Sequence, residues 1–322
     1  MVLHKLIAAI VFLLCVSPLA SSKIVFSSDR DGDDYEIYVM DDDGTHIQRL
    51  THHPDGDRTA TWSPNGKQIA FTREKKWQEG HKGQIINICV MYRDGSEGQQ
   101  ITDQNGIYNQ PRWSPDGKHI AFSGDDNINT IDMETQEVKP LLRNLKKEDA
   151  INIEDWSPDG KSIAYTVSPG LENILYTTDP NGNRQIQLLP AKGTYKYSFQ
   201  WSSDGKKSVY LEATYQGNDL ISDKIVVLGK RGLLLQKIDM TGKLFMHSVR
   251  WMGDHHLLIT AEVWSPPNLP SDIYIYTLAT GKITNLTNHP SRDFLGDWID
   301  DAALDVLPAG KLSIVWGQLK KP

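Results

Sequence analysis

A six-residue string, Trp-Ser-Pro-Asp-Gly-Lys, recurs along the chain and constrains its fold more than any other feature. Successive copies are 51, 43, 45, 50 and 47 residues apart, counted from Trp to Trp. A period of this length indicates a repeat architecture, in which each copy is one small unit that packs against its neighbours. Close copies begin at Trp62, Trp113, Trp156 and Trp201, and degenerate copies begin at Trp251 and Trp298.

Each repeat has the sequence signals of four short strands joined by tight turns. Ser-Pro-Asp-Gly is typical of a hairpin turn, because Pro presets φ and Gly accepts a positive φ. An apolar run such as Ile69-Ala70-Phe71 follows, then an alternating strand such as 36–41, and then a short strand that ends near Thr51. Four strands in about 45 residues make one propeller blade. We therefore predict an all-β fold, a six-bladed β-propeller of four-stranded blades. A linear β-solenoid is the alternative, although its coils are shorter.

The strands of the repeat are out of phase with the ends of the chain. The first apolar run, residues 24–26, has no Trp turn before it, and the strand around Trp298 has no full blade after it. We predict that this C-terminal strand completes the blade that begins at Lys23, which leaves no open sheet edge across the ring. An extra partial blade formed by the tail after Trp298 is the alternative. The predicted blades are roughly 23–61, 62–112, 113–155, 156–200, 201–250 and 251–297, with a closing strand and tail at 298–322.

The N-terminus has the pattern of a secretory signal peptide, which we place at residues 1–22. Lys5 precedes an apolar run from Leu6 to Val16, and small residues follow at 20–22. The run is too short for a membrane span, which needs about 20 residues. An uncleaved anchor is the alternative. We expect a periplasmic or secreted protein with no membrane span after cleavage. Only Cys89 would remain, so no internal disulfide is expected.

The charge of the chain argues against one class of partner. The formal net charge is -7, and no run of basic residues stands out. Binding to nucleic acid phosphates requires a basic patch, so we expect no nucleic-acid partner. We expect the protein to be a monomer.

These repeats resemble the TolB-type propeller repeat, a WD-like repeat of bacterial exported proteins. The four close Trp turns carry the resemblance, together with the strings at 28–32 and 37–41, and it extends from Lys23 to about Trp298. It implies the fold more than the function, since the same repeat occurs in scaffolds, peptidase lid domains and lyases. TolB itself has an α/β domain before the propeller. We expect that domain to be absent here, because the first blade starts directly after the predicted signal.

The chain lacks the sequence marks of the enzymes that share this repeat. It has no Gly-x-Ser-x-Gly turn, and we expect no hydrolase domain after Trp316. Adjacent residues on a strand point to opposite faces, so neither His52-His53 nor His255-His256 chelates a metal easily. We therefore expect a non-enzymatic scaffold that binds a protein or peptide of the cell envelope, with no catalytic residue and no cofactor. The alternative is a channel-site enzyme, such as an oligogalacturonate-type lyase, or a small-ligand binder.

Asp29, Asp31 and Asp33 are the candidate metal ligands. Alternating carboxylates around a Gly suit a hard cation such as calcium. The alternative is that they are turn formers between two strands, and they lack the spacing of a full calcium loop.

Five further residues are candidates for a binding surface. Asp57 and Asp293 each lie five residues before a Trp, in matching strings, and would either line a channel mouth or bridge neighbouring blades. Trp77 and His81 belong to one hairpin that is longer than the repeat allows, and Trp264 begins another. An exposed Trp in a long loop often carries recognition, whereas a plain insertion would fold it back onto the blade.

Overall fold

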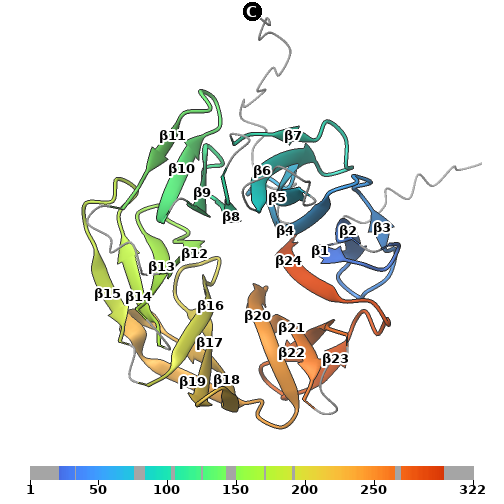
Figure 1. The fold of residues 1–322 in the computed structure, drawn as a ribbon. Helices are drawn as coiled ribbons and strands as arrows, with labels where there is room; N and C mark the ends of the chain where they lie inside the picture. Colours follow the sequence, from blue (N-terminus) through green and yellow to red (C-terminus); the bar gives the residue numbers. More distant parts are fainter. Residues whose placement is uncertain are drawn as a thin grey trace, which may run out of the picture.

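The computed structural model forms a ring of six four-stranded antiparallel sheets (Figure 1). The structure describes residues 22–32, 34–75, 84–102, 106–124, 126–142, 150–169, 172–190, 193–264 and 270–300. The predicted six-bladed propeller is confirmed, with the described residues almost all in strands and turns.

Three blades form the N-terminal half of the ring, and the strands of each blade follow one another from the centre outwards. The first contains β24 (Asp293–Ile299), β1 (Lys23–Ser28), β2 (Glu36–Asp41) and β3 (Gln48–Arg49). The second contains β4 (Gly56–Trp62), β5 (Gln68–Lys75), β6 (Ile85–Tyr92) and β7 (Gln99–Gln100). The third contains β8 (Asn109–Trp113), β9 (His119–Gly124), β10 (Asn127–Asp132) and β11 (Val138–Pro140).

The other three blades have the same order of strands. The fourth contains β12 (Ala150–Trp156), β13 (Ile163–Ser168), β14 (Ile174–Thr178) and β15 (Ile186–Leu189). The fifth contains β16 (Tyr195–Trp201), β17 (Ser208–Gln216), β18 (Asp219–Leu228) and β19 (Leu234–Asp239), with a 3-10 turn, η1 (Lys230–Gly232), before β19. The sixth contains β20 (Leu244–Met252), β21 (His256–Val263), β22 (Asp272–Thr277) and β23 (Ile283–Asn285).

The two ends of the described chain meet in the first blade. Strand β24 pairs antiparallel with β1, and this pairing places Trp298 opposite Ile24. The last strand is therefore the innermost strand of the first sheet, which confirms the predicted closure. Because the closing strand comes from the C-terminal side, opening the ring requires breaking a sheet and not only a loop contact.

Hydrogen bonds within the repeated turn explain its sequence. In the copy at Ser114, the backbone N–H of Gly117 donates to the Ser114 carbonyl at 2.9 Å, and Gly117 has a φ of +69°. The Ser114 hydroxyl donates to Asp116 at 2.6 Å and accepts the N–H of His119 at 2.9 Å. The same contacts recur in the turns at Ser63, Ser157 and Ser202. The Ser, Asp and Gly of the motif thus each contribute to the shape of the turn.

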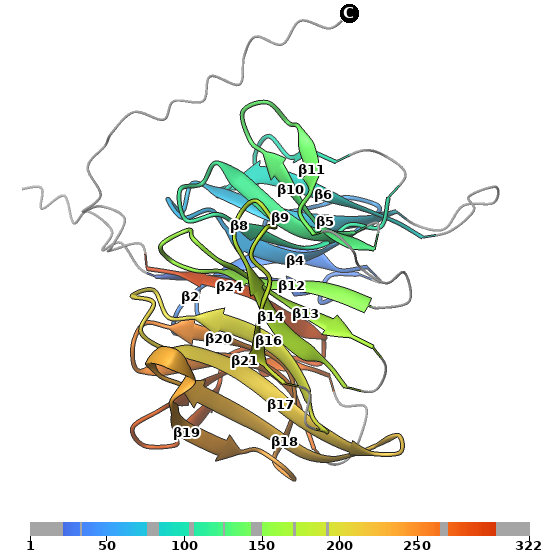
Figure 2. The same ribbon diagram turned by 90° about the vertical axis from the view of Figure 1, so that its left-hand side faces the viewer.

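The hydrophobic core lies between neighbouring blades. Val25 and Ile37 of the first blade pack in one cluster with Trp62, Ile69 and Phe71 of the second. Seen from the side, the sheets stack face to face around the ring (Figure 2). Because each blade buries both faces against its neighbours, stability accumulates around the ring as in other repeat folds.

Some sequence predictions fall on residues 1–21 and 301–322. The predicted signal segment, apart from Ser22, and the alternative of an extra partial blade in the tail lie outside the described residues. Within the part of the chain that the structure describes, no helix is long and apolar enough to cross a membrane.

Candidate functional site: the central channel

The six innermost strands each carry a β-bulge shortly before their Trp. They are β4, β8, β12, β16, β20 and β24, which surround the centre of the ring in Figure 1. A bulge bends a strand and re-aims its side chains. One consequence is that the residue before each Trp lines the channel. We call these six residues the channel ring: Thr61, Arg112, Asp155, Gln200, Arg250 and Asp297.

Half of the channel ring binds the backbone of the next blade. The Trp201 N–H donates to Asp155 at 2.9 Å, and the Trp251 N–H donates to Gln200 at 2.7 Å. In the same way, the Trp62 N–H donates to Asp297 at 3.1 Å across the ring closure. These side chains therefore tie adjacent blades together at the Trp, which is the most regular position of the repeat.

Carboxylates of the ring and its neighbour Glu154 are held in a buried environment. Burial raises the pKa of Glu154 to about 7 and that of Asp155 to about 7, although backbone N–H donors oppose the shift. Glu154 accepts the N–H of Phe199 and the hydroxyl of Thr166, both at 3.0 Å. Burial lowers the pKa of Arg112 to about 10, and the charge of Arg250 adds to that effect. The centre of the channel thus brings several ionisable side chains together, and two of its carboxyls have a raised pKa.

The raised pKa of Glu154 predicts how stability depends on pH. The folded protein keeps the proton of this carboxyl up to about pH 7, whereas the unfolded chain loses it near its ordinary pKa of 4.5. The free energy of unfolding should therefore fall as pH rises from 5 to 8, by on the order of a few kcal/mol for a fully buried group. Glu154→Gln removes this contribution. Urea unfolding of this variant at several pH values should give a flatter profile than the wild type.

The exposed carboxylate Glu134 provides the control for that measurement. Glu134→Gln should leave the pH profile of the unfolding free energy unchanged, because this side chain is in water in both states. If Glu154→Gln has the same slope as the wild type, Glu154 is charged in the folded protein at pH 6 and the assignment is wrong.

The channel opens into cavities of different size on the two sides of the ring. On the side where the inner strands begin, a cavity of about 450 Å³ forms what we call the wide mouth. On the Trp side, the cavity measures about 100 Å³. Aromatic side chains gather at the wide mouth, and we call four of them the aromatic rim: Tyr195, Tyr215, Phe245 and Phe294.

The aromatic rim continues through ring contacts with its neighbours. His247 lies 5.0 Å from Phe245 and 5.7 Å from Phe294, measured between ring centroids. Tyr35 also packs against Phe294, at 5.7 Å. Tyr215 has 44% of its surface exposed, so the rim presents apolar area to solvent. Aromatic side chains of this kind dominate binding energy at many protein interfaces.

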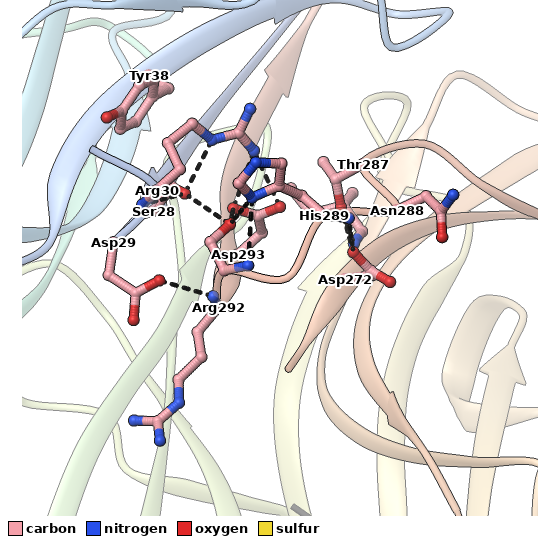
Figure 3. Close-up of polar contacts among 12 residues, drawn as sticks. Ser28, Asp29, Arg30, Tyr38, Asp272, Thr287, Asn288, His289, Arg292 and Asp293 are labelled. Atoms are coloured by element: carbon pink, nitrogen blue, oxygen red, sulfur yellow. Dashed lines mark hydrogen bonds and ion pairs between the residues drawn. The ribbon is translucent and has the colours of Figure 1, made fainter. Parts of the chain in front are cut away.

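The predicted surface residues Asp57 and Asp293 are fully buried and do not line either channel cavity. Figure 3 shows Asp293, which accepts two hydrogen bonds from the Arg30 guanidinium, both at 3.0 Å. Asp57 is also bound by an arginine, but here two nitrogens donate: Nε and Nη2 of Arg73 lie 2.7 and 2.8 Å from its two oxygens. Each aspartate N–H also donates to a carbonyl of the preceding blade. The aspartates of the two matching strings thus each form an ion pair within their own blade and a backbone hydrogen bond to the preceding one.

Two of the candidate calcium ligands point to different partners. Asp29 accepts the Arg292 N–H at 2.7 Å, as Figure 3 shows, and Asp31 accepts the Tyr38 hydroxyl at 2.7 Å. Asp33 lies outside the described residues. Among the residues that the structure describes, no group of three or more His, Cys, Asp and Glu side chains is arranged to hold a metal ion.

Strands β5 and β21, which precede the two long insertions in the sequence, end on the side of the wide mouth. The pairing of Gly56 with Glu74 puts the end of β5 beside the start of β4, which lies on that side. Trp77 and His81 lie outside the described residues. Trp264 is half-buried, and its backbone N–H donates to the Lys243 carbonyl at 3.1 Å.

The channel ring and its bulges are absent from the sequence predictions. Two residues could have indicated the bulges: Pro111 and Gly296 interrupt inner strands, and Pro or Gly inside a strand is typical of a bulge. The ring itself has no common residue type, so comparison of the copies could not find it.

Comparison with protein families agrees with this architecture. The model of the TolB beta propeller domain matches residues 15–139 and 87–236, which together make up more than half of the chain. The chain belongs to the TolB β-propeller family. The structure of TolB from Acinetobacter baumannii superimposes with a TM-score of 0.69 at 18% identity, over 87% of this chain and 67% of that one. At this level of identity, the likeness shows the fold alone.

Sequence relatives of this TolB-family chain match it only in part. The Tol-Pal system protein TolB of Francisella tularensis subsp. mediasiatica is 27% identical over 205 residues, which are 61% of this chain and 44% of the relative. TolB of Alcanivorax borkumensis is 28% identical over 105 residues, 32% of this chain and 23% of the relative. The chain thus spans less than half the length of these relatives. An oligogalacturonate lyase in complex with manganese shares the fold at 14% identity, with a TM-score of 0.56 over 83% of this chain and 74% of that one.

Proposed function

We propose that this protein is an exported, non-enzymatic propeller that binds a protein or peptide partner in the cell envelope through its wide mouth. The predicted signal segment at 1–22 supports a periplasmic or secreted location. The relatives are named as proteins of the Tol-Pal system, and this name supports a protein partner. It does not identify that partner, since the chain spans less than half of the length of these relatives. We propose a monomer that acts through this one surface.

The aromatic rim around the wide mouth carries the proposal. A cavity of about 450 Å³ is in the range that holds a few side chains of a peptide or a small ligand. Tyr and Phe supply large contact area at a low cost in side-chain entropy, and Tyr also offers a hydroxyl for hydrogen bonding. Strands β5 and β21 end on this same side, beside the starts of β4 and β20. A peptide segment or a protruding loop of a partner fits this combination.

The enzyme alternative has no comparable observation behind it. A lyase site of the metal-dependent kind needs several His or carboxylate groups that converge at one channel mouth. In the described ranges, the carboxylates of the channel instead accept backbone N–H groups of the next blade. We therefore propose no second function.

A pull-down with matched variants tests the proposal. The bait is the full chain incubated with envelope extract, and the rim variant carries Tyr195→Ala and Tyr215→Ala. Loss of two central aromatic anchors should reduce recovery of the specific partner about tenfold or more. The control carries Ile186→Ala and Leu188→Ala, which remove apolar side chains of similar exposure from the outer strand β15. Equal recovery by the rim variant and the control, or no partner for the wild type, would refute the proposal.

A further inference from the structure

Two arginines line the channel from opposite blades of the ring. Arg112 belongs to β8 and Arg250 to β20, and these strands lie on opposite sides of the centre in Figure 1. Both side chains line the wide cavity and also the smaller cavity on the Trp side. They therefore stand where the two cavities approach each other.

The acidic groups around them are engaged elsewhere. Asp155 accepts the Trp201 N–H, and Asp297 accepts both the Trp62 N–H and the Thr61 hydroxyl. Neither guanidinium has a carboxylate of a described residue within 4.0 Å. The carboxylates of the ring thus stabilise the blade contacts and do not form direct ion pairs with the arginines.

The arginines keep unused donors that face the channel. Arg112 donates through Nε to the Glu154 carbonyl at 2.8 Å and through Nη1 to the Pro111 carbonyl at 3.0 Å. Arg250 donates through Nη1 to the Ser198 hydroxyl at 3.3 Å and to the Val249 carbonyl at 3.2 Å. Among the described residues, Nη2 of Arg112 and both Nε and Nη2 of Arg250 have no acceptor. A guanidinium carries five N–H donors. These three nitrogens are not among the buried unpaired atoms of the described residues, so they are open to the channel.

The surroundings make this an unusual place for two like charges. Arg250 is only 7% exposed. The strongest charge effect on Arg112 is repulsion by Arg250, ahead of attraction by Asp155, and it adds to burial in lowering the pKa of Arg112. An anion between the two guanidinium groups would offset that repulsion and satisfy the free donors.

We propose that Arg112 and Arg250 form a carboxylate-binding site at the centre of the channel. A planar monoanion fits better than a phosphate, because the nearby acidic groups oppose a second negative charge and the Arg fork matches a carboxylate. The source of the carboxylate rests on the proposed function. If the wide mouth admits a partner, the carboxylate is an acidic side chain or the C-terminus of that partner. A free small carboxylate has the same chemistry.

The affinity of this site should depend on pH. The charged or titratable groups that line the cavities around the arginines are Glu154 and Asp155 from β12, Asp297 from β24, His247 from β20, and the tyrosines of the rim and its neighbour Tyr197. Strands β4 and β16 contribute Thr61 and Gln200 to the channel ring, and these do not titrate. Protonation of Glu154 and Asp155 near pH 7 removes negative charge beside the arginines. Acetate should therefore bind several-fold more tightly at pH 6 than at pH 8.

Crystals of the full chain soaked in bromide locate the site without any substitution. The anomalous signal should place bromide between the two guanidinium groups, and acetate added to the soak should displace it. Ligand-observed NMR with acetate then compares Arg250→Gln with Arg58→Gln, which removes an exposed arginine of the inner strand β4. We expect at least a fivefold loss of acetate binding for Arg250→Gln and none for Arg58→Gln. Absence of bromide between the arginines, or unchanged acetate binding in a folded Arg250→Gln, would overturn the proposal.

The pull-down described above separates the two sources of the carboxylate. If the partner supplies it, Arg250→Gln reduces recovery of the partner and excess acetate competes with it. If a free carboxylate is the ligand, Arg250→Gln loses acetate binding and still recovers the partner. If the pull-down yields no partner but bromide binds between the arginines, the proposed function is refuted. The proposal of a carboxylate-binding site is still supported in that case.

Discussion

Gly296→Ala is expected to lower the unfolding midpoint of the protein by about 10 °C. Gly296 is the extra residue of the bulge in β24, since Phe26 pairs with Leu295 and Val25 with Asp297. A Cβ at this position would lie 2.2 Å from the Ala60 carbonyl oxygen and 2.9 Å from that of Val25. Both contacts are with backbone, which cannot move aside as a side chain can. The closing strand would have to shift away from both neighbours, at a cost of several kcal/mol.

Gly98→Ala is the matched control for this substitution. An added Cβ at Gly98 meets no atom within 4 Å, and Gly98 is not among the residues with positive φ. Thermal unfolding followed by circular dichroism should give this variant a midpoint close to that of the wild type. A Gly296→Ala protein as stable as Gly98→Ala would mean that β24 does not close the ring in this register.

The second large effect is expected at the ion pair that joins the two ends of the described chain. Asp293→Asn leaves the Arg30 guanidinium without its bidentate partner in a site where Asp293 is fully buried. Breaking one side of a buried ion pair typically costs about 3–5 kcal/mol. Urea unfolding should therefore show a loss of about 3 kcal/mol for Asp293→Asn. Asp57→Asn should lose a similar amount, because Asp57 is also fully buried and paired with an arginine, Arg73.

A double-mutant cycle makes this prediction specific to the pair. If the loss in Asp293→Asn comes from the stranded charge of Arg30, then adding Arg30→Gln should recover part of it. Additive losses in the double variant would show that the two side chains stabilise the blade independently. That outcome would contradict the role of the pair in joining the two ends of the described chain within the first blade.

Much of the fold follows from the repeated turn. Its Pro, Asp and Gly determine a hairpin, and its spacing determines a four-stranded blade, so the number of blades and the closure could both be predicted. The missing Trp turn before residues 24–26 was sufficient to indicate that the last strand belongs to the first blade. These inferences rest on positions where the copies agree.

The channel ring could not be predicted because it lies where the copies differ. The residue before each Trp is Thr, Arg, Asp, Gln, Arg and Asp in turn, so these six positions have no common residue type in the sequence. Only the closed ring brings Arg112 opposite Arg250 and puts each carboxylate beside the Trp of the next blade. The bulges add to the difficulty, since they turn side chains away from the strict alternation of an ideal strand.

The candidate aspartates fit the second interpretation of their matching strings, contact with the neighbouring blade, and not the first, a channel mouth. Asp57 and Asp293 were chosen because their surrounding strings repeat. In the structure each forms an ion pair with an arginine, and the spacing in the sequence did not predict either pair. In contrast, the aromatic rim consists of residues such as Tyr215 and Phe245 that fit an ordinary strand pattern. Their position at one mouth follows from the three-dimensional arrangement of the blades.

Site-specific photo-crosslinking tests the central claim, that the wide mouth holds the partner, most directly. A photoreactive phenylalanine analogue replaces Tyr215 at the wide mouth in one protein and Leu188 on the outer strand β15 in another; both positions are exposed. On irradiation in envelope extract, the first should form a discrete adduct with one partner, and the second should form none. Adducts from the Leu188 position alone, or the same adducts from both positions, would contradict the claim.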